Sequence, residues 1–396
     1  MESAASTSAQ LSRNAAENLP AGALQSKLEL AAKEARPLRI KLGLDPTAPD
    51  IHLGHTVVLT KLREFQDQGH RVVLIVGDYT ARVGDPSGRS ETRPVLSTDE
   101  IITNANSYEA QAGRILDQDP DRYELRFNSE WLDMSMADLL ALVRTTTIAQ
   151  LLEREDFSTR YKAGSPISVL ELLYPLMQGY DSVAVEADVE IGGTDQTFNI
   201  LLGRDIQRHY AVPEQAVMTM PILPGIDGVD KMSKTKGNEI AIEASPDEMF
   251  GRTMRLPDEA MANWFELLAI DPPADGTGAR DRKVALAKAL VARFHDEAAA
   301  DAAEAQFVSQ FAKHELPDEI EEFSLSVGDA VVHLPLALAE GFEISRSEAR
   351  RLVEQGGVKI DGAVVDPSQL DVASDLLSGA VVQIGRRRFK RFLVDR

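Results

Sequence analysis

The 396-residue sequence contains no cysteine, so disulfides and thiolate metal sites are excluded. No apolar run approaches the ~18–20 residues that a helix needs to cross a bilayer. The first 20 residues are small and polar, and they lack the basic start and apolar stretch of a secretory signal. We therefore expect a cytoplasmic enzyme whose first 20 residues form a loose extension.

Histidine is also scarce, with seven in the chain, and the sequence holds no Walker motif, which excludes a P-loop NTPase. Basic residues are outnumbered by acidic ones, 42 to 63, and the net charge of −21 argues against non-specific nucleic-acid binding. The imbalance is not uniform. From Phe342 onward ten Lys and Arg face eight Asp and Glu, whereas the preceding 341 residues carry 32 against 55. This asymmetry suggests a C-terminal module with a partner of its own.

The first half of the chain alternates between buried strands and amphipathic helices. Residues 38–45 read as a strand, residues 55–68 as a helix and residues 71–78 as a fully buried strand, an order that forms a right-handed parallel crossover. The pattern recurs with a helix near 195–209 and a strand at 216–223. We predict an α/β, doubly wound (Rossmann-like) parallel sheet, which binds ligands beyond the carboxyl ends of its strands.

After Gly228 the strand signal stops, and residues 245–315 are mostly helical. The final part is compact and mixed, with "VKIDGAVV" as a hairpin that turns at Asp361-Gly362. We predict four segments: an N-terminal extension and leading helix (1–35), a Rossmann-like catalytic domain (36–228), a loop with a helical domain (229–328) and a small α+β domain (329–396).

The stretch "HLGH" places His52 and His55 three residues apart where a loop becomes a helix. Surface histidines and half of a metal site are the alternatives, but a metal needs further ligands and a supporting shell, and no cysteine or clustered histidine is available. Helix amides at such a turn attract phosphate, and imidazole N–H groups stabilise developing negative charge. Gly54 would let a ligand approach the backbone. We predict a phosphate site and no metal site.

A second motif, "DKMSKTKGN" at 230–238, follows the last strand of the predicted sheet. Many Lys-rich turns are merely solvated polar loops, and that interpretation stays open. The alternative is a mobile flap that brings the ammonium groups of Lys231 and Lys234 to a polyphosphate.

Taken together and in this order, HLGH and KMSKT resemble the HIGH and KMSKS signatures of class I aminoacyl-tRNA synthetases. The stretches "YPLMQGYD" (174–181), "IGGTDQTFN" (191–199) and "VGDPSGRSETR" (83–93) resemble bacterial tyrosyl-tRNA synthetases, and the likeness covers nearly the whole chain, including a C-terminal S4-like RNA-binding module. The resemblance implies a homodimeric ligase that joins L-tyrosine to tRNA(Tyr) through tyrosyl-adenylate. It also implies ATP with substrate-bound Mg²⁺, and no zinc.

The resemblance also implies site residues. The catalytic set is His52, His55, Lys231, Lys234 and Thr235. The ATP-binding set is Asp45, Thr47, His52, Gly54, His55, Gly193, Asp195, Gln196, Lys231 and Lys234. The tyrosine-binding set is Asp85, Tyr174, Gln178, Asp181 and Gln196. Three members of the last set, Tyr174, Gln178 and Asp181, line one helix face by their spacing. A polar exposed stripe is the alternative, but the helix is otherwise apolar, and a phenol needs a buried acceptor such as Asp181.

Several positions depart from the best-known bacterial pattern. Lys41-Leu42 stand where a Tyr-Cys pair precedes the glycine of the first strand, so the tyrosine that would help to hold the phenol is missing. Arg89 replaces a common lysine and Val58 a polar residue. These changes fit a second bacterial branch of the same enzyme, and they leave Asp181 as the main phenol anchor.

Basic residues gather in the C-terminal module. The predicted RNA-binding set is Arg346, Arg350, Arg351, Lys359, Arg386, Arg387, Arg388 and Lys390, with Arg391 beside it. A solvated charged face is the alternative to a grip on RNA phosphates. Two other functions stay open at this point: a tryptophan-type class I synthetase, and a non-catalytic RNA-binding protein on a synthetase fold.

Overall fold

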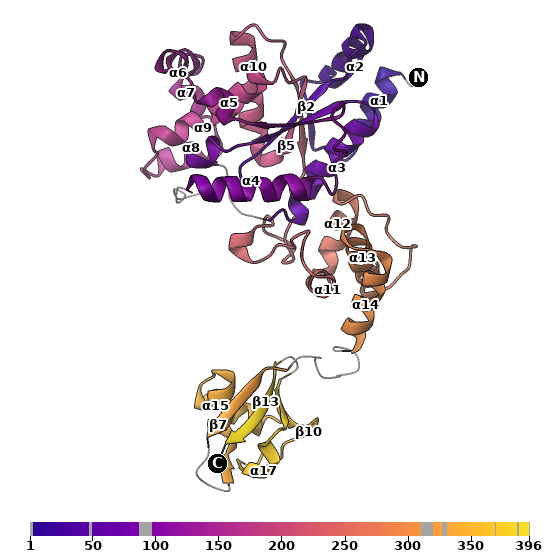
Figure 1. Ribbon diagram of the computed structural model, residues 1–396, viewed down its shortest axis with the longest axis vertical. Helices are drawn as coiled ribbons and strands as arrows, with labels where there is room; N and C mark the ends of the chain where they lie inside the picture. The colour runs from indigo at the N-terminus through magenta and orange to yellow at the C-terminus, as the bar shows by residue number, and fades with distance from the viewer. Residues whose placement is uncertain are drawn as a thin grey trace. The chain divides into compact units, whose positions relative to one another are not determined.

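A computed structural model of the chain describes residues 3–46, 50–86, 97–309, 320–326, 331–368, 370–385 and 388–395. The chain divides into two compact units, the first ending at Glu304 and the second running from Ala305 to Arg396. Figure 1 shows both units. Within the described ranges, no helix combines the length and the apolar character needed to span a membrane.

A six-stranded sheet forms the centre of the first unit. Its strands are β1 (Glu17–Leu19), β2 (Arg39–Leu44), β3 (Arg71–Val76), β4 (Tyr123–Phe127), β5 (Val189–Gly193) and β6 (Ala216–Met220), in the order β1-β6-β5-β2-β3-β4. Strands β6 to β4 in this order are mutually parallel, and β1 pairs with β6 antiparallel. The chain order reverses between β5 and β2, which confirms the predicted doubly wound sheet.

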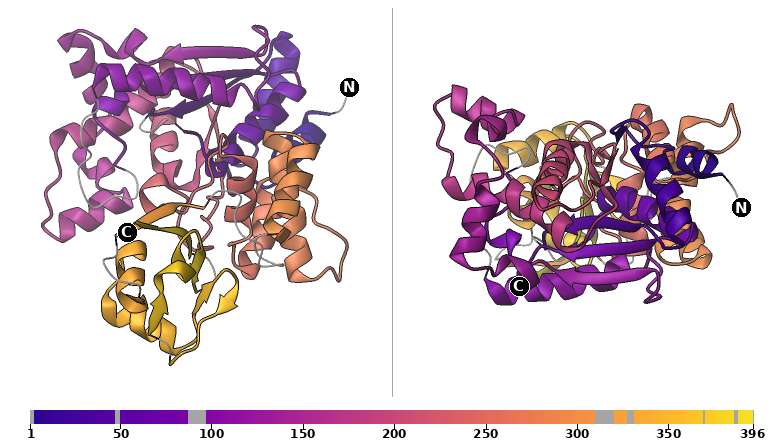
Figure 2. Two further views of the ribbon diagram at one scale, coloured as in Figure 1. Left: turned by 60° about the horizontal axis from the view of Figure 1, so that its bottom comes forward. Right: turned by 90° about the horizontal axis from the view of Figure 1, so that it is seen from above.

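Helices cover both faces of this sheet, as the two views in Figure 2 show. The helices of this part of the chain are α1 (Ala4–Leu11), α2 (Ala23–Glu34), α3 (Leu53–Asp67), α4 (Thr98–Ala112), α5 (Ser129–Leu132), α6 (Met136–Val143), α7 (Ile148–Leu151), α8 (Glu155–Lys162), α9 (Val169–Ala184) and α10 (Thr197–His209). Helix α1 packs on α2 and α3, α9 packs on α10, and α10 contacts β5 and β6. Strand β3 is buried after its first residue because helices shield it from water on both sides.

Residues 3–20 are not the loose extension that their composition predicted. They include α1 and β1, whose Leu19 pairs with Val217 of β6. Leu11 at the end of α1 is buried, and the ammonium of Lys61 on α3 donates to the carbonyls of Leu11 (3.1 Å) and Arg13 (2.8 Å). A buried lysine thus satisfies carbonyls that the end of α1 would otherwise leave unpaired.

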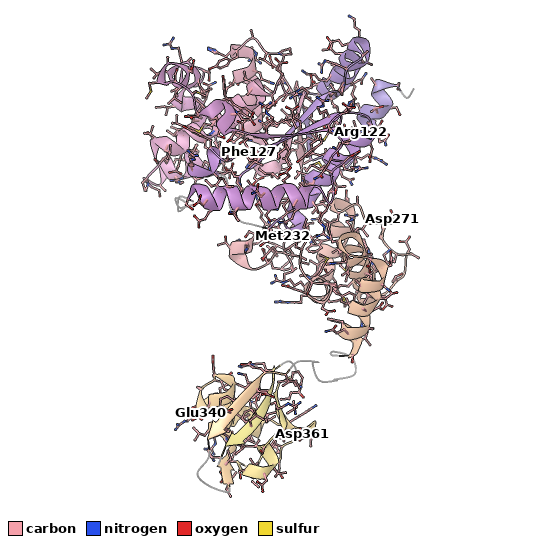
Figure 3. The ribbon with its side chains drawn as sticks, viewed as in Figure 1. Arg122, Phe127, Met232, Asp271, Glu340 and Asp361 are labelled. Atoms are coloured by element: carbon pink, nitrogen blue, oxygen red, sulfur yellow. The ribbon has the colours of Figure 1, made fainter. Side chains whose placement is uncertain are left out.

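The sheet is followed by a loop and a helical region, whose last helix crosses the boundary between the two units at Glu304. Its helices are α11 (Pro246–Thr253), α12 (Met261–Leu267), α13 (Ala279–Phe294) and α14 (Glu297–Phe307), and a short 3₁₀ helix, η3 (Lys234–Lys236), lies in the loop. Met232, labelled in Figure 3, lies in this loop, between the sheet and α11 to α14.

The second unit contains a five-stranded sheet, ordered β10-β9-β12-β13-β7, and a two-stranded one. Its elements are β7 (Glu322–Ser326), β8 (Val331–His333), α15 (Leu334–Phe342), α16 (Arg346–Glu354), β9 (Val358–Ile360), β10 (Ala363–Val364), β11 (Asp371–Ala373), α17 (Ser374–Leu377), β12 (Val381–Ile384) and β13 (Arg388–Asp395). Strands β9 and β10 form the predicted hairpin, and Asp361, labelled in Figure 3, lies in its turn. Both turn residues, Asp361 and Gly362, have positive φ. Because β7 pairs with β13, it belongs to this unit, although the predicted boundary followed residue 328.

Candidate active site

The candidate site lies where parallel strands end beside the point of chain reversal. Asp45 directly follows β2, Gly77 follows β3, and Asp195 and Gln196 follow β5. Carboxyl ends of parallel strands meet at one edge of a sheet, and ligands of doubly wound sheets bind at this edge beside the point of reversal, here between β2 and β5. Residues about 150 positions apart in the sequence are therefore brought to the same edge.

The two histidines of HLGH begin α3. His52 is the N-cap residue, and its Nδ1 accepts a hydrogen bond from the backbone N–H of Gly54 (3.2 Å). The Nδ1 of His55 accepts in turn from the backbone N–H of His52 (3.2 Å). The rings stack with their centroids 3.9 Å apart. This arrangement is a reciprocal capping box built from imidazoles, which satisfies two amides at the helix start.

These hydrogen bonds also fix the protonation of both rings. Burial lowers the pKa of His52 to about 2, with His55 and Lys231 adding to the effect, and lowers the pKa of His55 to about 4, with Lys231 adding to it. Both rings are therefore neutral near pH 7. Since Nδ1 is the acceptor in each ring, the remaining proton sits on Nε2. The pair thus offers two neutral N–H donors at a helix N-terminus.

The segment that follows the second motif is joined through the backbone to the start of α3. Leu53 donates to the carbonyl of Ile240 (2.9 Å), and Ile242 donates to the carbonyl of Ile51 (3.0 Å). Gly54 is needed here for close packing: a Cβ at this position would lie 2.9 Å from Cε1 of His52 and 3.5 Å from Cβ of Met232. Gly54 is therefore packed against His52 and Met232, and the approach of a ligand to its backbone stays a prediction.

Two lysines of the loop form ion pairs with carboxylates outside the loop. The Lys231 ammonium lies 2.5 Å from the Asp195 carboxylate, and the Lys234 ammonium lies 2.8 Å from the Asp50 carboxylate. Both lysine side chains are more than half exposed, and Thr235 is exposed on η3. The loop thus carries two cations to the edge of the sheet where Asp195 lies.

Asp181 is a buried carboxylate on α9, with 3% of its surface exposed. The indole Nε1 of Trp131 donates to one oxygen (2.8 Å), and the amide of Asn128 lies 3.5 Å from the other. Burial raises the pKa of Asp181 to about 7, opposed first by the charge of Lys41 and then by the hydrogen bonds of Trp131 and Asn128. Neither Trp131 nor Asn128 was predicted, although Trp131 is one of two tryptophans in the chain.

Tyr174 and Asp45 are joined directly. The Tyr174 hydroxyl donates to one Asp45 oxygen (2.9 Å), and the Thr80 hydroxyl donates to the other (2.7 Å). Burial and the neighbouring Asp45 carboxylate raise the pKa of Tyr174 well above its usual value, so its phenol stays neutral. Glycine is required at position 77, because a Cβ there would lie 2.1 Å from the Asp45 carboxylate.

A network of amides and carboxylates links the remaining predicted tyrosine-binding residues. The Gln196 amide donates to Asp85 (2.8 Å), and the Asn199 amide donates to the side-chain oxygens of Gln178 (2.9 Å) and Gln196 (3.0 Å). The buried Arg154 guanidinium donates to Asn199 (2.9 Å) and lies 3.6 Å from Asp85. Sequence reasoning missed Arg154 and Asn199, although Asn199 is part of the quoted "IGGTDQTFN" stretch.

Lys41, which replaces the usual tyrosine, is fully buried and pairs with Glu190 on the neighbouring strand β5 (2.9 Å). Tyr174 and Asp181 are buried and Gln178 is half-buried, so the α9 residues do not form an exposed polar stripe. Four of the residues singled out from the sequence lie outside the described residues: Thr47, Arg89, Arg386 and Arg387.

The basic residues of the second unit divide into two groups. Arg346, Arg350 and Arg351 are exposed on α16, and Lys359 is half-buried on β9. Strand β13 uses its cations within the unit: the guanidinium of Arg388 donates to the Phe342 carbonyl, Lys390 pairs with Glu321 (2.8 Å), and Arg391 donates to the Gly379 carbonyl (3.0 Å). On α16, Arg350 pairs with Glu354 (2.8 Å), and Arg346 and Arg351 are exposed beside it.

Within the described part of the chain, no three His, Cys, Asp or Glu side chains are grouped so that they could hold a metal ion. The arrangement instead offers neutral N–H donors, two lysines and buried carboxylates at one edge of the sheet. Such a site can bind a polyphosphate beside a polar organic substrate.

The chain matches known proteins over nearly its whole length. Residues 33–312 match the family of "tRNA synthetases class I (W and Y)", and residues 334–370 match the S4 domain. A tyrosine–tRNA ligase of Moorella thermoacetica is 49% identical over 96% of this chain and 94% of its own. One from Bordetella avium is 49% identical over 92% and 91%, respectively.

Solved structures show the same fold. A C-terminally truncated mitochondrial tyrosyl-tRNA synthetase of Aspergillus nidulans aligns with a TM-score of 0.63 and 22% identity, over 78% of this chain and 95% of that one. The tyrosyl-tRNA synthetase of Archaeoglobus fulgidus, solved with L-tyrosine, aligns with a TM-score of 0.61 and 21% identity, over 75% and 99%.

Proposed function

Because the chain belongs to the class I tRNA synthetases of the tryptophan and tyrosine group, we propose that it charges tRNA(Tyr) with tyrosine. It is an aminoacyl-tRNA ligase: tyrosine and ATP give tyrosyl-adenylate and pyrophosphate, and the tyrosyl group then moves to the 3′ end of the tRNA. Curated relatives named tyrosine–tRNA ligase, 47% to 49% identical over nearly the full chain, support this function.

The buried Asp181 is the observation that carries the choice of tyrosine. A phenol hydroxyl that donates to this carboxylate replaces the hydrogen bond from water that the carboxylate loses on burial. Phenylalanine would leave the carboxylate without that donor, and an unsatisfied buried acceptor is unfavourable. (The synthetase for tyrosine is the worked example of this principle.) The indole of Trp131 and the amide of Asn128 lie against the two carboxylate oxygens and fix the orientation of the Asp181 side chain.

The opposite end of tyrosine fits the amide network. We assign its ammonium to Asp85, Tyr174 and Gln178, whose oxygens are acceptors near the carboxyl ends of the strands. Gln196 bridges this group to the adenylate side through its bond to Asp85. On that side we assign Asp45, Thr47, Gly193 and Asp195 to the ATP, with Asp195 as an acceptor for a ribose hydroxyl.

The chemistry of the first step needs no nucleophile from the protein. A carboxylate oxygen of tyrosine attacks the α-phosphorus of ATP, and the bond from that phosphorus to the bridging oxygen breaks to release pyrophosphate. The Nε2–H groups of His52 and His55 donate to the phosphate oxygens as their charge grows, and Lys231 and Lys234 neutralise the departing pyrophosphate. Thr235 lies on the same loop turn. ATP enters with Mg²⁺, which its phosphates hold.

The second unit binds the tRNA in this proposal. Exposed arginines on α16 and the cations of β9 and β13 would neutralise RNA phosphates, and an S4 domain match covers α16. We assign residues 36–228 to catalysis, residues 229–328 to the loop and a tRNA-facing helical domain, and residues 329–396 to RNA binding, with residues 1–35 leading in. We place the enzyme in the cytoplasm.

An apolar face supports a homodimer. Met136, Leu140 and Val143 lie on one side of α6 and are exposed, as are Ile148 on α7 and Val169 at the start of α9. Helices α6 and α7 lie near each other in Figure 1, away from α11 to α14. Adjacent exposed apolar side chains of this size are typical of an interface. A second copy, with the same face, would cover them by two-fold symmetry.

ATP–pyrophosphate exchange with each of the twenty amino acids tests this function. We expect exchange with tyrosine and charging of tRNA(Tyr) by the same preparation. Exchange with tryptophan alone would identify the related tryptophan enzyme, and no exchange with any amino acid would leave a non-catalytic RNA-binding protein.

A further inference from the structure

The strongest feature that the proposed reaction leaves unused is a buried ion pair below the tyrosine-binding residues. Lys41 on β2 and Glu190 on β5 are cross-strand neighbours in the register of the parallel pair. Their charged atoms are 2.9 Å apart, and their side chains are 0% and 3% exposed. Two opposite charges therefore lie inside the sheet layer at the point of chain reversal.

The three protons of the Lys41 ammonium have three acceptors. Besides Glu190, these are the Gln178 backbone carbonyl (2.9 Å) and the Ser182 hydroxyl (2.8 Å), both on α9. A lysine whose donors are all directed at protein oxygens does not take over the phenol contact of the tyrosine that it replaces.

Glu190 instead reaches a proposed substrate-binding side chain. One oxygen accepts from the Ser182 hydroxyl (3.0 Å) and the Gln215 amide (2.5 Å), and the other lies 3.4 Å from the Nε2 of Gln178. On its other side, the Gln178 oxygen accepts from Asn199 (2.9 Å). An acceptor on one side and a donor on the other define which way the Gln178 amide points.

Stability alone is a weak reason for such a pair. Desolvation of two charges offsets their attraction, and apolar residues of similar volume often stabilise a core equally well. The chain nevertheless keeps two charges in contact with α9, the helix that carries Gln178 and Asp181. What the pair does provide is a negative acceptor whose charge is balanced and whose position is fixed.

We propose that Lys41 and Glu190 are a positioning pair for the substrate ammonium. Lys41 holds Glu190 in place as a charged acceptor, Glu190 holds the Nε2 of Gln178, and the Gln178 oxygen is thereby presented to the ammonium of tyrosine. This inference rests on the proposed function, because it takes Gln178 as a contact of the tyrosine ammonium. Lys41 and Glu190 touch no substrate themselves.

Two variants test the proposal in tyrosine-dependent pyrophosphate exchange. Glu190→Gln replaces the fixed acceptor by an amide that can present either end to Gln178. Lys41→Met/Glu190→Leu removes both charges at similar volume. We expect each to raise the KM for tyrosine about tenfold, the effect of losing one oriented hydrogen bond to a charged group. The KM for ATP and kcat should stay within about twofold of wild type.

A double-mutant cycle asks whether the effect passes through Gln178. In a Gln178→Met background, where no amide is left to orient, adding Glu190→Gln should leave the KM for tyrosine unchanged. Lys61→Met is the matched control, because it also removes a buried ammonium (2% exposed) that donates to backbone carbonyls, but on α3. It should lower the melting temperature and leave the KM for tyrosine at the wild-type value.

The outcomes separate the two claims. If the wild-type protein shows no exchange with tyrosine, the proposed function fails. If the wild type is active and both Glu190 variants keep its KM for tyrosine, the positioning role is overturned. It is equally overturned if tyrosine KM, ATP KM and kcat all worsen together with the melting temperature, or if Glu190→Gln acts as strongly without Gln178 as with it.

Discussion

Asp181 sits at the deep end of the proposed tyrosine pocket, where it exchanges water for an indole and an amide donor. Replacing it by alanine removes the charged acceptor for the phenol and leaves the ATP residues intact. We expect Asp181→Ala to lose about 1.5–3 kcal/mol or more of discrimination between tyrosine and phenylalanine. The ratio of kcat/KM for the two amino acids in pyrophosphate exchange measures this. An unchanged ratio, with normal ATP binding, would reject the assignment.

The same carboxylate predicts a pH dependence. Burial raises its pKa to about 7, so the free enzyme takes up a proton there as the pH falls through neutrality. A protonated acid is a weaker acceptor for a phenol, and we therefore expect the KM for tyrosine to rise as the pH falls from about 8 to about 6. The two histidines do not contribute, because their pKa values of about 2 and about 4 lie below this range.

Asp181→Asn is the control for that titration, since an amide has no charge to lose. Its KM for tyrosine should be higher than that of the wild type and nearly independent of pH over the same range. A profile that keeps the wild-type slope in this variant would assign the titration to another group.

At the scale of the element, the lysines of the loop around η3 should affect the rate of adenylate formation. Lys231→Ala and Lys234→Ala should slow tyrosyl-adenylate formation and leave tyrosine affinity nearly intact, because their charges act mainly on the departing pyrophosphate. Rapid-quench measurement of adenylate formation gives the rate constant, and equilibrium dialysis gives the affinity.

Lys236→Ala provides a matched control on the same turn. Lys236 is about equally exposed, but it pairs with Asp230 within the loop (2.7 Å). Lys231 and Lys234 instead pair with Asp195 and Asp50, which lie outside the loop. The Lys236→Ala variant should form adenylate at the wild-type rate. If all three variants did so, the loop would be no more than a solvated turn.

Three central strands were predictable because parallel strands covered on both faces are mostly apolar. Strands β2, β3 and β6 fell within the predicted ranges 38–45, 71–78 and 216–223 for this reason. Strand β1 was not predictable, because its three residues gain their partner from β6, some 200 positions later. Short segments that depend on such distant pairing carry no periodic signal of their own.

The site shows the same division between local and distant information. The signature motifs and the α9 residues Tyr174, Gln178 and Asp181 could be recognised because the residues of each group are close in sequence. The partners of Asp181 lie about 50 positions before it, and Lys41 meets Glu190 across nearly 150 positions. Tertiary structure alone brings these groups together, so sequence reasoning marked Lys41 as unusual without finding its partner Glu190.

For the whole molecule, the division into two units predicts separable activities. A chain ending at Ser309 keeps the sheet, both signature motifs and α11 to α14, and it leaves out β7, which pairs with β13 of the second unit. It should retain tyrosine-dependent pyrophosphate exchange and charge tRNA poorly. Equal aminoacylation by the full and shortened chains would show that the second unit does not provide the RNA-binding surface.

Salt dependence adds a physical readout to this comparison. Binding of tRNA by the full chain should weaken steeply with salt, because each neutralised phosphate releases counterions. The shortened chain should bind more weakly and with a shallower slope. Exchange activity measured on the same preparation shows that the shortened chain is folded.

The apolar face on α6 and α7 leads to a prediction about assembly. Leu140→Asp places a charge in the middle of the exposed face, and burying an unpaired charge in an interface is strongly unfavourable. Sedimentation equilibrium should show a dimer for the wild type and a shift to monomer for the variant. Leu376→Asp, at an equally exposed leucine on α17 of the second unit, should leave the dimer intact. A wild-type monomer would contradict the proposed homodimer.

The two imidazoles that cap α3 serve both the stability of the helix and the proposed chemistry. Each ring holds an amide of the helix start with one nitrogen and offers a donor with the other. Removing an N-cap side chain lowers helix stability by about 0.5–2 kcal/mol even where no reaction is involved. An alanine scan of HLGH would therefore overstate the catalytic share of each histidine. Asparagine, whose amide has both an acceptor and a donor, would give the fairer measure.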